Sequence, residues 1–545
     1  MKKYLYPIVI SKIRPYLKLW FLKGGEYLSA IMQSLPLTLN NTLWATLRNI
    51  KIYGNTVQDG EPTPENPVEI INVEGKNLFN KNLEASLSLG ATKSSLDTGV
   101  RITSTADGTY KYCGIELGKD ELLGKTLTLS LKITPNASND GICILYYGNS
   151  SNIVSVVGIS RTSSGKATGT IASSFPNNCD RIYILFYSNR NGTGVTDDYV
   201  DYTNVQIEEG SVATPYVPYN SIGVKVQNKN LLKLISKDNF SWNGLTITSV
   251  DRSSYKLNQT ATGTNSLIIM ENLVLEAGTY TISQTNLIYN DNNNRVVVID
   301  ESTSNAIANT QGVTSTTFTI AEEKTVKVQI VILSGSIFNN TIVNFQLKKS
   351  TTASSYIAHA EQNKYFTFEE GQYLAEGDYL ADDGIHKIWG EVVLDGSEDE
   401  VFGVSTALNT TDYNCFYCIN GSFAQAPNDT TICVYCDKLI GESSNHRTVN
   451  KMNCWLSHFN NSNLFMHVPN TITTVEELKT WLSNNNLIFQ FILREPTVIP
   501  YTQTQQEEWN EIKKLHSYNE QTNIDVLANL SAKISLDYMV KGGEN

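Results

Sequence analysis

The chain contains an internal repeat, and this repeat constrains the fold more than any other feature of the sequence. The first copy opens with Lys76-Asn77-Leu78-Phe79 and the second with Lys229-Asn230-Leu231-Leu232. The closing segments also match, because Asn204-Val205-Gln206-Ile207 corresponds to Asn344-Phe345-Gln346-Leu347, and a Tyr follows each closing Asn after twelve positions. Each copy spans about 130 residues, the size of one domain. The sequence therefore predicts two tandem modules of one fold, over 76–218 and 229–358.

Both modules show the alternation of apolar and polar residues that is typical of strands. Every second residue is apolar over 127–133 in the first copy and over 326–332 in the second. This period places the apolar side chains on one face of each strand. Many short strands separated by turns indicate a β-sandwich or jelly roll. We therefore predict a mainly β protein with tandem β-sandwich or jelly-roll modules and a C-terminal β-rich domain with short helices.

The modules are preceded by two segments. Residues 1–50 form an N-terminal segment in which three prolines exclude a long helix: Pro7, Pro15 and Pro36. Residues 51–75 form a connector that contains Pro62, Pro64 and Pro67. Each of these prolines fixes φ and favours extended geometry at the residue before it. The pattern predicts a stiff connector that leads into the first module.

Two further segments follow the modules. Residues 361–500 form a C-terminal β-rich domain with a helix over 475–482, for which Thr473 or Thr474 is the expected cap. Residues 501–545 contain a helix and then a strand. We place the start of that helix at a capping box formed by Thr504 and Glu507.

The charge of the chain limits its partners. The formal net charge is −12, which argues against nucleic acid, because binding to phosphate needs clustered Lys and Arg. Residues 1–51 are basic, with six Lys and two Arg against one Glu. This segment either docks onto an acidic partner or forms an ordinary solvated face. We predict no membrane insertion, because no run approaches the roughly eighteen apolar residues of a membrane helix.

Four cysteines have a spacing close to that of a zinc site: Cys415, Cys418, Cys433 and Cys436. Both pairs lie in expected strands, where positions three apart point to opposite faces. This geometry favours buried thiols over a metal site. A disulfide between Cys415 and Cys436, or between Cys418 and Cys433, is an open alternative.

The sequence contains no recognisable catalytic constellation. All six His fall in the last two-fifths of the chain, and none lies in the two modules. We find no nucleophile elbow, phosphate loop or zinc-protease helix. We therefore expect a binding protein that needs no cofactor.

Several motifs resemble those of a known group of proteins. The connector 54–70 before Lys76-Asn77-Leu78-Phe79, and the C-terminal segments 436–439, 474–482 and 499–502, resemble tail and minor structural proteins of phages and prophages of gut bacteria. The strand Gly278-Thr279-Tyr280-Thr281-Ile282-Ser283 resembles jelly-roll domains of the carbohydrate-binding-module type. The resemblance implies a virion protein of the tail, baseplate or fibre that contributes to attachment to a host-surface glycan.

The resemblance also implies assembly and candidate site residues. It implies a homo-oligomer, for which we expect a trimer, joined to other virion proteins through the basic N-terminal segment. Aromatic rings can serve as platforms for sugars, and the candidates in the two modules are Tyr146, Tyr147, Tyr183, Tyr187, Trp242 and Tyr289. Two alternatives stay open: a purely structural collar, head-fibre or decoration protein, and a tail-associated polysaccharide depolymerase.

Overall fold

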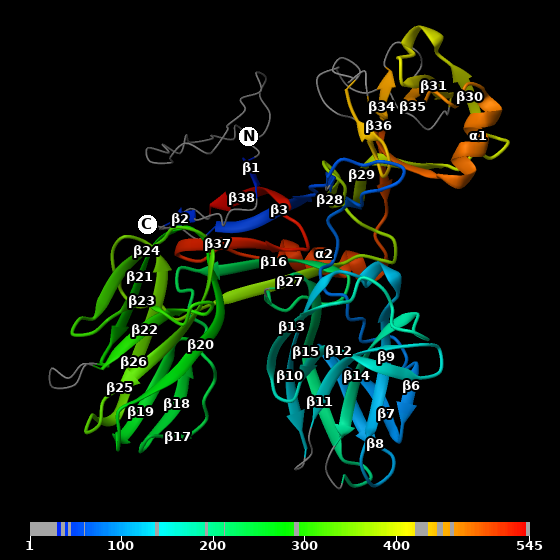
Figure 1. Ribbon diagram of the computed structural model, residues 1–545. Helices are drawn as coiled ribbons and strands as arrows, with labels where there is room; N and C mark the ends of the chain where they lie inside the picture. Colours follow the sequence, from blue (N-terminus) through cyan, green and yellow to red (C-terminus); the bar gives the residue numbers. More distant parts are fainter. Residues whose placement is uncertain are drawn as a thin grey trace.

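The computed structural model describes residues 30–33, 39–41, 45–58, 60–136, 141–190, 194–211, 213–287, 294–419, 434–443, 451–457 and 463–540 of the 545-residue chain. Strands predominate in these residues, and the two α-helices among them are α1 (Val475–Asn484) and α2 (Gln503–Lys513). The predicted mainly β class is therefore confirmed. Figure 1 shows a central hub, two sandwiches that hang from one side of it, and a distal domain beyond its other side.

The hub is built from two sheets and α2. The seven-stranded sheet has the order β1 (Ala30–Gln33), β38 (Lys533–Val540), β3 (Ala45–Tyr53), β28 (Tyr379–Ala381), β29 (Gly384–Leu394), β36 (Leu487–Ile499) and β32 (Val434–Cys436). The four-stranded sheet has the order β2 (Leu39–Asn41), β37 (Glu520–Leu527), β16 (Ser221–Asn228) and β27 (Glu361–Thr367). Their apolar faces share one core with Trp509 and Ile512 of α2. The hub therefore joins strands from near the N-terminus and near the C-terminus of the described chain.

The start of α2 differs from the predicted capping box. Thr502 is the N-cap, since its side chain accepts a hydrogen bond from the N–H of Gln505 and the Gln505 side chain accepts one from the N–H of Thr502. Gln505 is buried, and its amide also donates to the carbonyl of Thr367 at 3.0 Å. This contact with β27 holds the capping residue in place. The prediction of Thr504 and Glu507 was wrong by one half-turn of helix.

The first sandwich contains two five-stranded sheets. One has the order β13 (Gly165–Thr170), β10 (Thr126–Pro135), β15 (Tyr199–Glu209), β8 (Gly99–Ser104) and β7 (Ala91–Leu96). The other has the order β12 (Ile153–Arg161), β11 (Ile142–Gly148), β14 (Arg181–Asn189), β9 (Lys111–Gly118) and β6 (Leu87–Leu89). A short 3-10 turn, η1 (Asp120–Leu122), precedes β10. The alternating leucines of β10 face the core between the sheets, as predicted.

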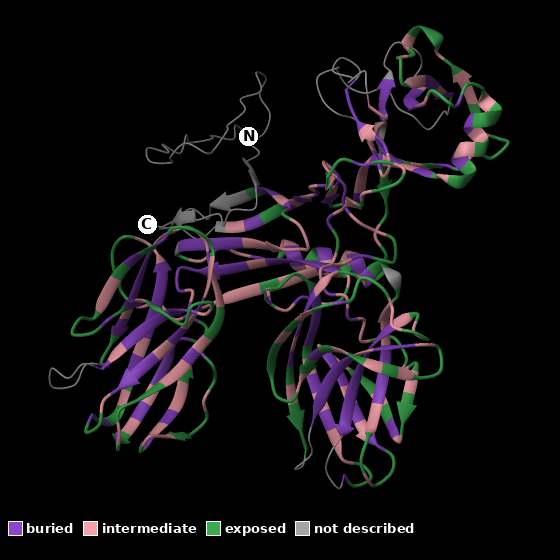
Figure 2. Ribbon diagram, in the orientation of Figure 1, coloured by how far each residue is buried: buried purple, intermediate pink, exposed green. Residues whose placement is uncertain are grey.

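The second sandwich repeats this strand order, except that, in the described residues, its larger sheet has a sixth strand and its smaller sheet lacks a fifth. Its larger sheet runs β24 (Ser315–Ile320), β21 (Gly278–Thr285), β26 (Ile337–Lys349), β19 (Ser254–Thr260), β18 (Leu245–Asp251) and β17 (Phe240–Trp242). Its smaller sheet runs β23 (Ala306–Asn309), β22 (Arg295–Asp300), β25 (Lys324–Ile332) and β20 (Asn265–Leu275). Buried residues fill the interior of both sandwiches (Figure 2). The repeat in the sequence thus corresponds to a repeat in topology.

The repeated Asn of each module ties its opening segment to its closing strand. The Asn77 amide donates to the carbonyls of Val205 and Val217 at 3.0 and 2.9 Å, and its oxygen accepts from Phe79 and Ile207. Asn230 donates to the carbonyls of Phe345 and Ile357 at 3.0 and 2.9 Å, and accepts from Leu232 and Leu347. Both Asn side chains are buried. We call each set of four hydrogen bonds an Asn latch.

Three units are insertions into the hub. The second sandwich lies between β16 and β27, where Gln227 and Glu361 are directly paired. The first sandwich lies between the connector and β16, and Asn77 and Tyr219 bridge its two chain crossings. The distal domain lies between β29 and β36, where Leu394 and Leu487 are paired. Each unit is therefore attached to the hub by two neighbouring segments of chain.

The distal domain combines a five-stranded sheet with α1. The sheet has the order β30 (Val401–Val404), β31 (Tyr413–Ile419), β35 (Asn463–Pro469), β34 (Asn453–Ser457) and β33 (Ile440–Gly441), and η2 (Thr406–Leu408) precedes β31. Thr474 caps α1 and forms a capping box with Glu477, so the predicted cap is confirmed. The connector contributes β4 (Val57–Gln58) and β5 (Ile70–Ile71). It contacts the edge strand β32 of the seven-stranded sheet, since Gln58 Nε2 donates to the Cys436 carbonyl at 2.8 Å.

Candidate functional site

Three of the candidate tyrosines meet on the outer face of the first sandwich. Tyr146 on β11 is directly opposite Tyr183 on β14, and Tyr187 of β14 is opposite Tyr112 of β9. They form a cluster separate from the core, with Ile142, Ile144 and Leu185. The rings of Tyr112 and Tyr187 lie 5.3 Å apart. Burial, with a hydrogen bond to Tyr146, raises the pKa of Tyr187.

Burial contradicts the prediction for three of the six aromatic candidates. Tyr183 and Tyr187 are 1% and 2% exposed, and Tyr147 packs inside the sandwich core. These rings fill space between neighbouring side chains, so they offer no open platform. Tyr146 and Tyr112 are half-buried at the rim of the cluster, and Tyr112 was missed because its sequence context resembles that of any strand tyrosine.

The remaining two aromatic candidates lie in the second sandwich. Trp242 of β17 is half-buried and packs against the core. Its neighbour Phe240 is more exposed, and Lys237 Nζ lies 4.4 Å from the centre of that ring. Tyr289 lies outside the described residues. The exposed aromatic group of this hairpin is therefore Phe240, which the sequence did not single out.

The described cysteines do not converge on one point. Cys415 and Cys418 lie on opposite faces of β31: Cys415 packs with Trp455 and Phe465, whereas Cys418 packs in the distal core with Cys436. A disulfide between Cys415 and Cys436 is thus excluded by their separate clusters. Cys433 lies outside the described residues, and among those described no three His, Cys, Asp or Glu side chains are grouped as metal ligands.

A cleft of about 730 Å³ lies between the two sandwiches, under the four-stranded sheet of the hub. The alternation of β16 explains its polar roof. Ile222, Val224 and Val226 enter the hub core, so Gly223, Lys225 and Gln227 face the other way. Tyr365, Asn363 and Glu361 of β27 and Leu527, Asp525 and Asn523 of β37 are in register with them and line the same cleft.

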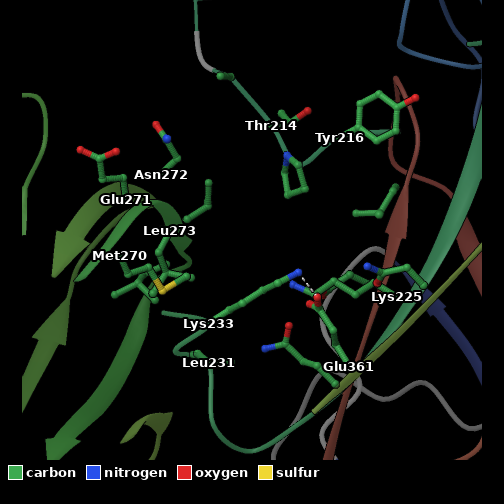
Figure 3. A pocket seen from close by; sticks show the side chains of 18 of the residues that line it. Thr214, Tyr216, Lys225, Leu231, Lys233, Met270, Glu271, Asn272, Leu273 and Glu361 are labelled. Atoms are coloured by element: carbon green, nitrogen blue, oxygen red, sulfur yellow. Dashed lines mark hydrogen bonds and ion pairs between the residues drawn. The ribbon is translucent and has the colours of Figure 1, made fainter. Parts of the chain in front are cut away.

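Both sandwiches supply the walls of this cleft. The first contributes Leu131 and Lys132 of β10 and the segment with Tyr216, and the second contributes Met270 and Leu273 of β20. Figure 3 shows Lys233 extending from the second sandwich to Glu361 of the hub, with which it forms an ion pair. The cleft is therefore composite, because three units of the fold are needed to enclose it.

Glu361 of the cleft has a strongly perturbed pKa. Burial raises its pKa, but the close contacts with His359 and Lys233, with the charges of Lys233 and Lys225, lower it to about 2. His359 Nε2 lies 3.4 Å from Glu361 Oε2, and His359 Nδ1 lies 2.6 Å from the carbonyl oxygen of Asn230 in the Asn latch. Glu361 thus couples the roof of the cleft to the base of the second sandwich.

This coupling predicts a defined pH dependence of stability. The pKa of Glu361 in the folded protein lies below the ordinary Glu value of 4.5. The ionised carboxylate therefore stabilises the fold above pH 4.5, and this contribution is lost as the pH falls toward 2. We expect Glu361→Gln to lower the free energy of unfolding by about 3 kcal/mol at neutral pH. Urea unfolding at a series of pH values measures the difference, which should vanish at the acid end. The exposed Glu323→Gln is the control, and equal pH profiles for both variants would contradict this assignment.

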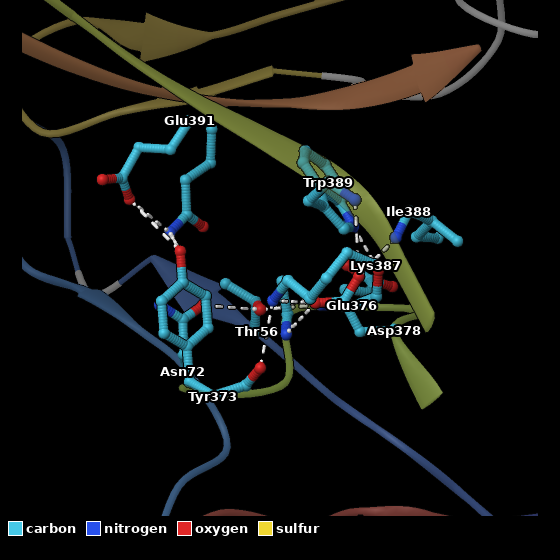
Figure 4. A network of polar contacts seen from close by, with 11 residues as sticks. Thr56, Asn72, Tyr373, Glu376, Asp378, Lys387, Ile388, Trp389 and Glu391 are labelled. Atoms are coloured by element: carbon cyan, nitrogen blue, oxygen red, sulfur yellow. Dashed lines mark hydrogen bonds and ion pairs between the residues drawn. The ribbon is translucent and has the colours of Figure 1, made fainter. Parts of the chain in front are cut away.

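A second polar cluster lies where the hub meets the distal domain (Figure 4). The Asp378 side chain is buried and pairs with Lys387. Its carboxylate also accepts from the N–H groups of Ala375 and Ile388 at 2.8 and 2.7 Å. Burial raises the pKa of Asp378, and Lys387 opposes that rise. Both carboxylate oxygens already have partners, so this cluster fixes the junction and offers no open binding group.

Comparison with known proteins adds little to this picture. No protein-family model matches the chain, and no curated protein matches it either. Among solved structures, the tandem CBM51 modules of the family 98 glycoside hydrolase of Streptococcus pneumoniae SP3-BS71 are similar at 10% identity, with a TM-score of 0.14, over 58% of this chain and all of that chain. Because this score is low, the fold assignment rests on the strand order described above. No helix in the described ranges is long and apolar enough to cross a membrane.

Proposed function

We propose that the protein is a structural component of a phage tail, baseplate or fibre that attaches to glycans on the host surface. The observation that carries this proposal is the placement of two like sandwiches on one side of a single hub, with a polar cleft between them. Such an arrangement presents several binding surfaces in one direction. The virion assignment is supported by the resemblance of the connector and the modules to phage structural proteins.

The proposed mechanism is binding without catalysis. In a homo-oligomer, for which we propose a trimer, each copy would add two sandwiches and one cleft, and linked weak contacts gain strength through their high effective concentration. The basic segment 1–51 would join the protein to acidic surfaces of other virion proteins. The protein would then act in the virion after assembly in the host cytoplasm, without a cofactor, nucleic acid or membrane insertion.

Binding to intact cells tests this function. We expect the purified full chain, labelled with a fluorophore, to bind saturably to cells of a candidate gut bacterium, and to lose this binding after periodate oxidation of the surface sugars. Presentation as a tetramer on streptavidin should strengthen binding at least about 100-fold. Release of soluble sugar from the cells would instead indicate a depolymerase. A lack of binding by the full chain, both alone and on streptavidin, across a panel of hosts, would contradict attachment and favour a purely structural virion role.

A further inference from the structure

The roof of the cleft contains polar groups without partners in the described part of the chain. Gln227 is only 3% exposed, yet no described group forms a hydrogen bond with its Oε1. Lys225 and Asp525 are cross-strand neighbours on β16 and β37, and neither has a hydrogen bond or ion pair among the described residues. All three side chains line the same cavity. A ligand that donates and accepts hydrogen bonds there would satisfy them.

The physical cost of these groups indicates a binding role. A buried amide oxygen without a partner destabilises a fold, and native proteins keep few of them. Burial also raises the pKa of Asp525, with Glu276 adding to the rise while Lys225 and Lys349 oppose it. By contrast, Glu361 and Glu276 nearby are already paired with Lys233 and Lys349. The cleft therefore contains paired groups beside groups that have no partner among the described residues.

The charges of the cleft select the chemical class of its ligand. Five lysines and five carboxylates line it, so the cavity has no excess of either sign. A polyanion or polycation would gain little from such a balanced surface, whereas sugar hydroxyls can both donate to Asp525 or Gln227 and accept from Lys225. The volume of about 730 Å³ falls within the usual range of ligand pockets, about 300–1,000 Å³.

An aromatic ring completes the roof. The ring of Tyr365 occupies the space above Gly223, where a Cβ would lie 2.8 Å from the ring. Tyr365 is half-buried and lines the cleft, and its hydroxyl donates to the carbonyl of Tyr216 at 3.4 Å. This contact fixes a flat apolar surface beside the unsatisfied groups. A flat ring next to hydrogen-bonding side chains suits the two kinds of surface that a sugar ring presents.

We infer that this cleft binds a short, uncharged saccharide segment, with Lys225, Gln227 and Asp525 as its polar contacts and Tyr365 as its aromatic contact. The inference rests on the proposed function in glycan attachment and gives that function a location. Because the hub and both sandwiches enclose the cleft, binding requires these three units together. It differs from binding on the outer face of one sandwich, where Tyr112 and Tyr146 lie.

The test uses full-length variants and a defined set of saccharides. The probes are neutral gluco-, manno-, galacto- and N-acetylglucosamine oligosaccharides on an array, with carboxylated and sulfated counterparts. Lys225→Met and Asp525→Asn should each weaken binding to the preferred neutral probe by at least about tenfold. Lys256→Met is the matched control, since Lys256 lies on β19 outside the lining of the cleft. Binding should change little between about 50 and 500 mM NaCl.

Thermal unfolding separates a binding role from a structural one. Asp525 has no hydrogen bond or ion pair among the described residues and burial raises its pKa, so Asp525→Asn should leave the midpoint of unfolding unchanged or slightly higher. Lys225→Met removes a charge that helps to keep Glu361 ionised, so it should lower the midpoint only slightly. If both variants bind the saccharide as tightly as the wild type, the cleft is not the binding site, although glycan attachment stands. This conclusion is strongest if Tyr146→Ser abolishes binding. Steeply salt-dependent binding to charged probes alone would overturn the neutral class. If the wild type binds no saccharide on the array and its binding to cells survives periodate, the partner on the cell is a protein. That result would overturn both proposals.

Discussion

Replacement of Asp378 by Ala is expected to lower the free energy of unfolding by about 3–5 kcal/mol. The Asp378 carboxylate is fully buried and pairs with Lys387, so its removal leaves the ammonium group without its counter-charge. The same change also removes the acceptor of the N–H groups of Ala375 and Ile388. Breaking one partner of a buried pair costs more than the pair contributes, because the other charge stays buried.

The comparison that checks this result is Asp383→Ala, measured by urea unfolding with Asp378→Ala in parallel. Asp383 lies on the turn that follows β28, whereas Asp378 directly precedes that strand. Asp383 contacts His386 at 2.6 Å, but its side chain is 67% exposed. Exposed pairs of this kind contribute about 0–1 kcal/mol. Hydrogen exchange should also show faster opening of residues 374–390 in Asp378→Ala. If both alanine variants were equally stable, the cluster in Figure 4 would not hold the junction.

The sequence predicted the sandwiches well because their evidence is local. Alternation within β10 and β25 defines one buried face in each strand, and the repeated Asn motifs mark where each module opens and closes. The hub left no such local trace. β16 pairs with β27 across the whole second sandwich, and β3 pairs with β38 from nearly the opposite end of the chain. Pairing between such distant segments is not encoded in any window of sequence.

The site residues were harder to predict than the fold for a related reason. Adjacent tyrosines such as Tyr146 and Tyr147 point to opposite faces of β11, so one reaches the outer cluster and the other the core. Composition alone cannot decide between these faces. The alternation of Val224, Lys225 and Val226 could have revealed a strand with one polar face. It could not have revealed that both sandwiches close around that face.

Replacement of Asn77 or Asn230 by Ala is expected to lower the stability of the corresponding sandwich by about 3–4 kcal/mol. Each side chain makes four hydrogen bonds to the backbone, and Ala would leave the four backbone groups without their partners. Buried backbone groups that lose a partner cost about 1–3 kcal/mol each, less where water can enter. The loss should be local, because the four side-chain hydrogen bonds of each Asn latch all lie within its own module.

The two latches serve as controls for each other. In Asn77→Ala, hydrogen exchange measured by mass spectrometry should accelerate over 78–79 and 205–217, while 231–232 and 345–357 keep their protection, and Asn230→Ala should give the reverse pattern. Asn82→Ala, at an exposed position in the first sandwich, should leave both regions unchanged. Asn77→Asp separates the donors from the acceptor, since it keeps the oxygen that accepts from Phe79 and Ile207 but loses both donated bonds. Equal acceleration in both modules from a single replacement would mean that the sandwiches unfold together through the hub, and that the latches stabilise the whole assembly rather than one module each.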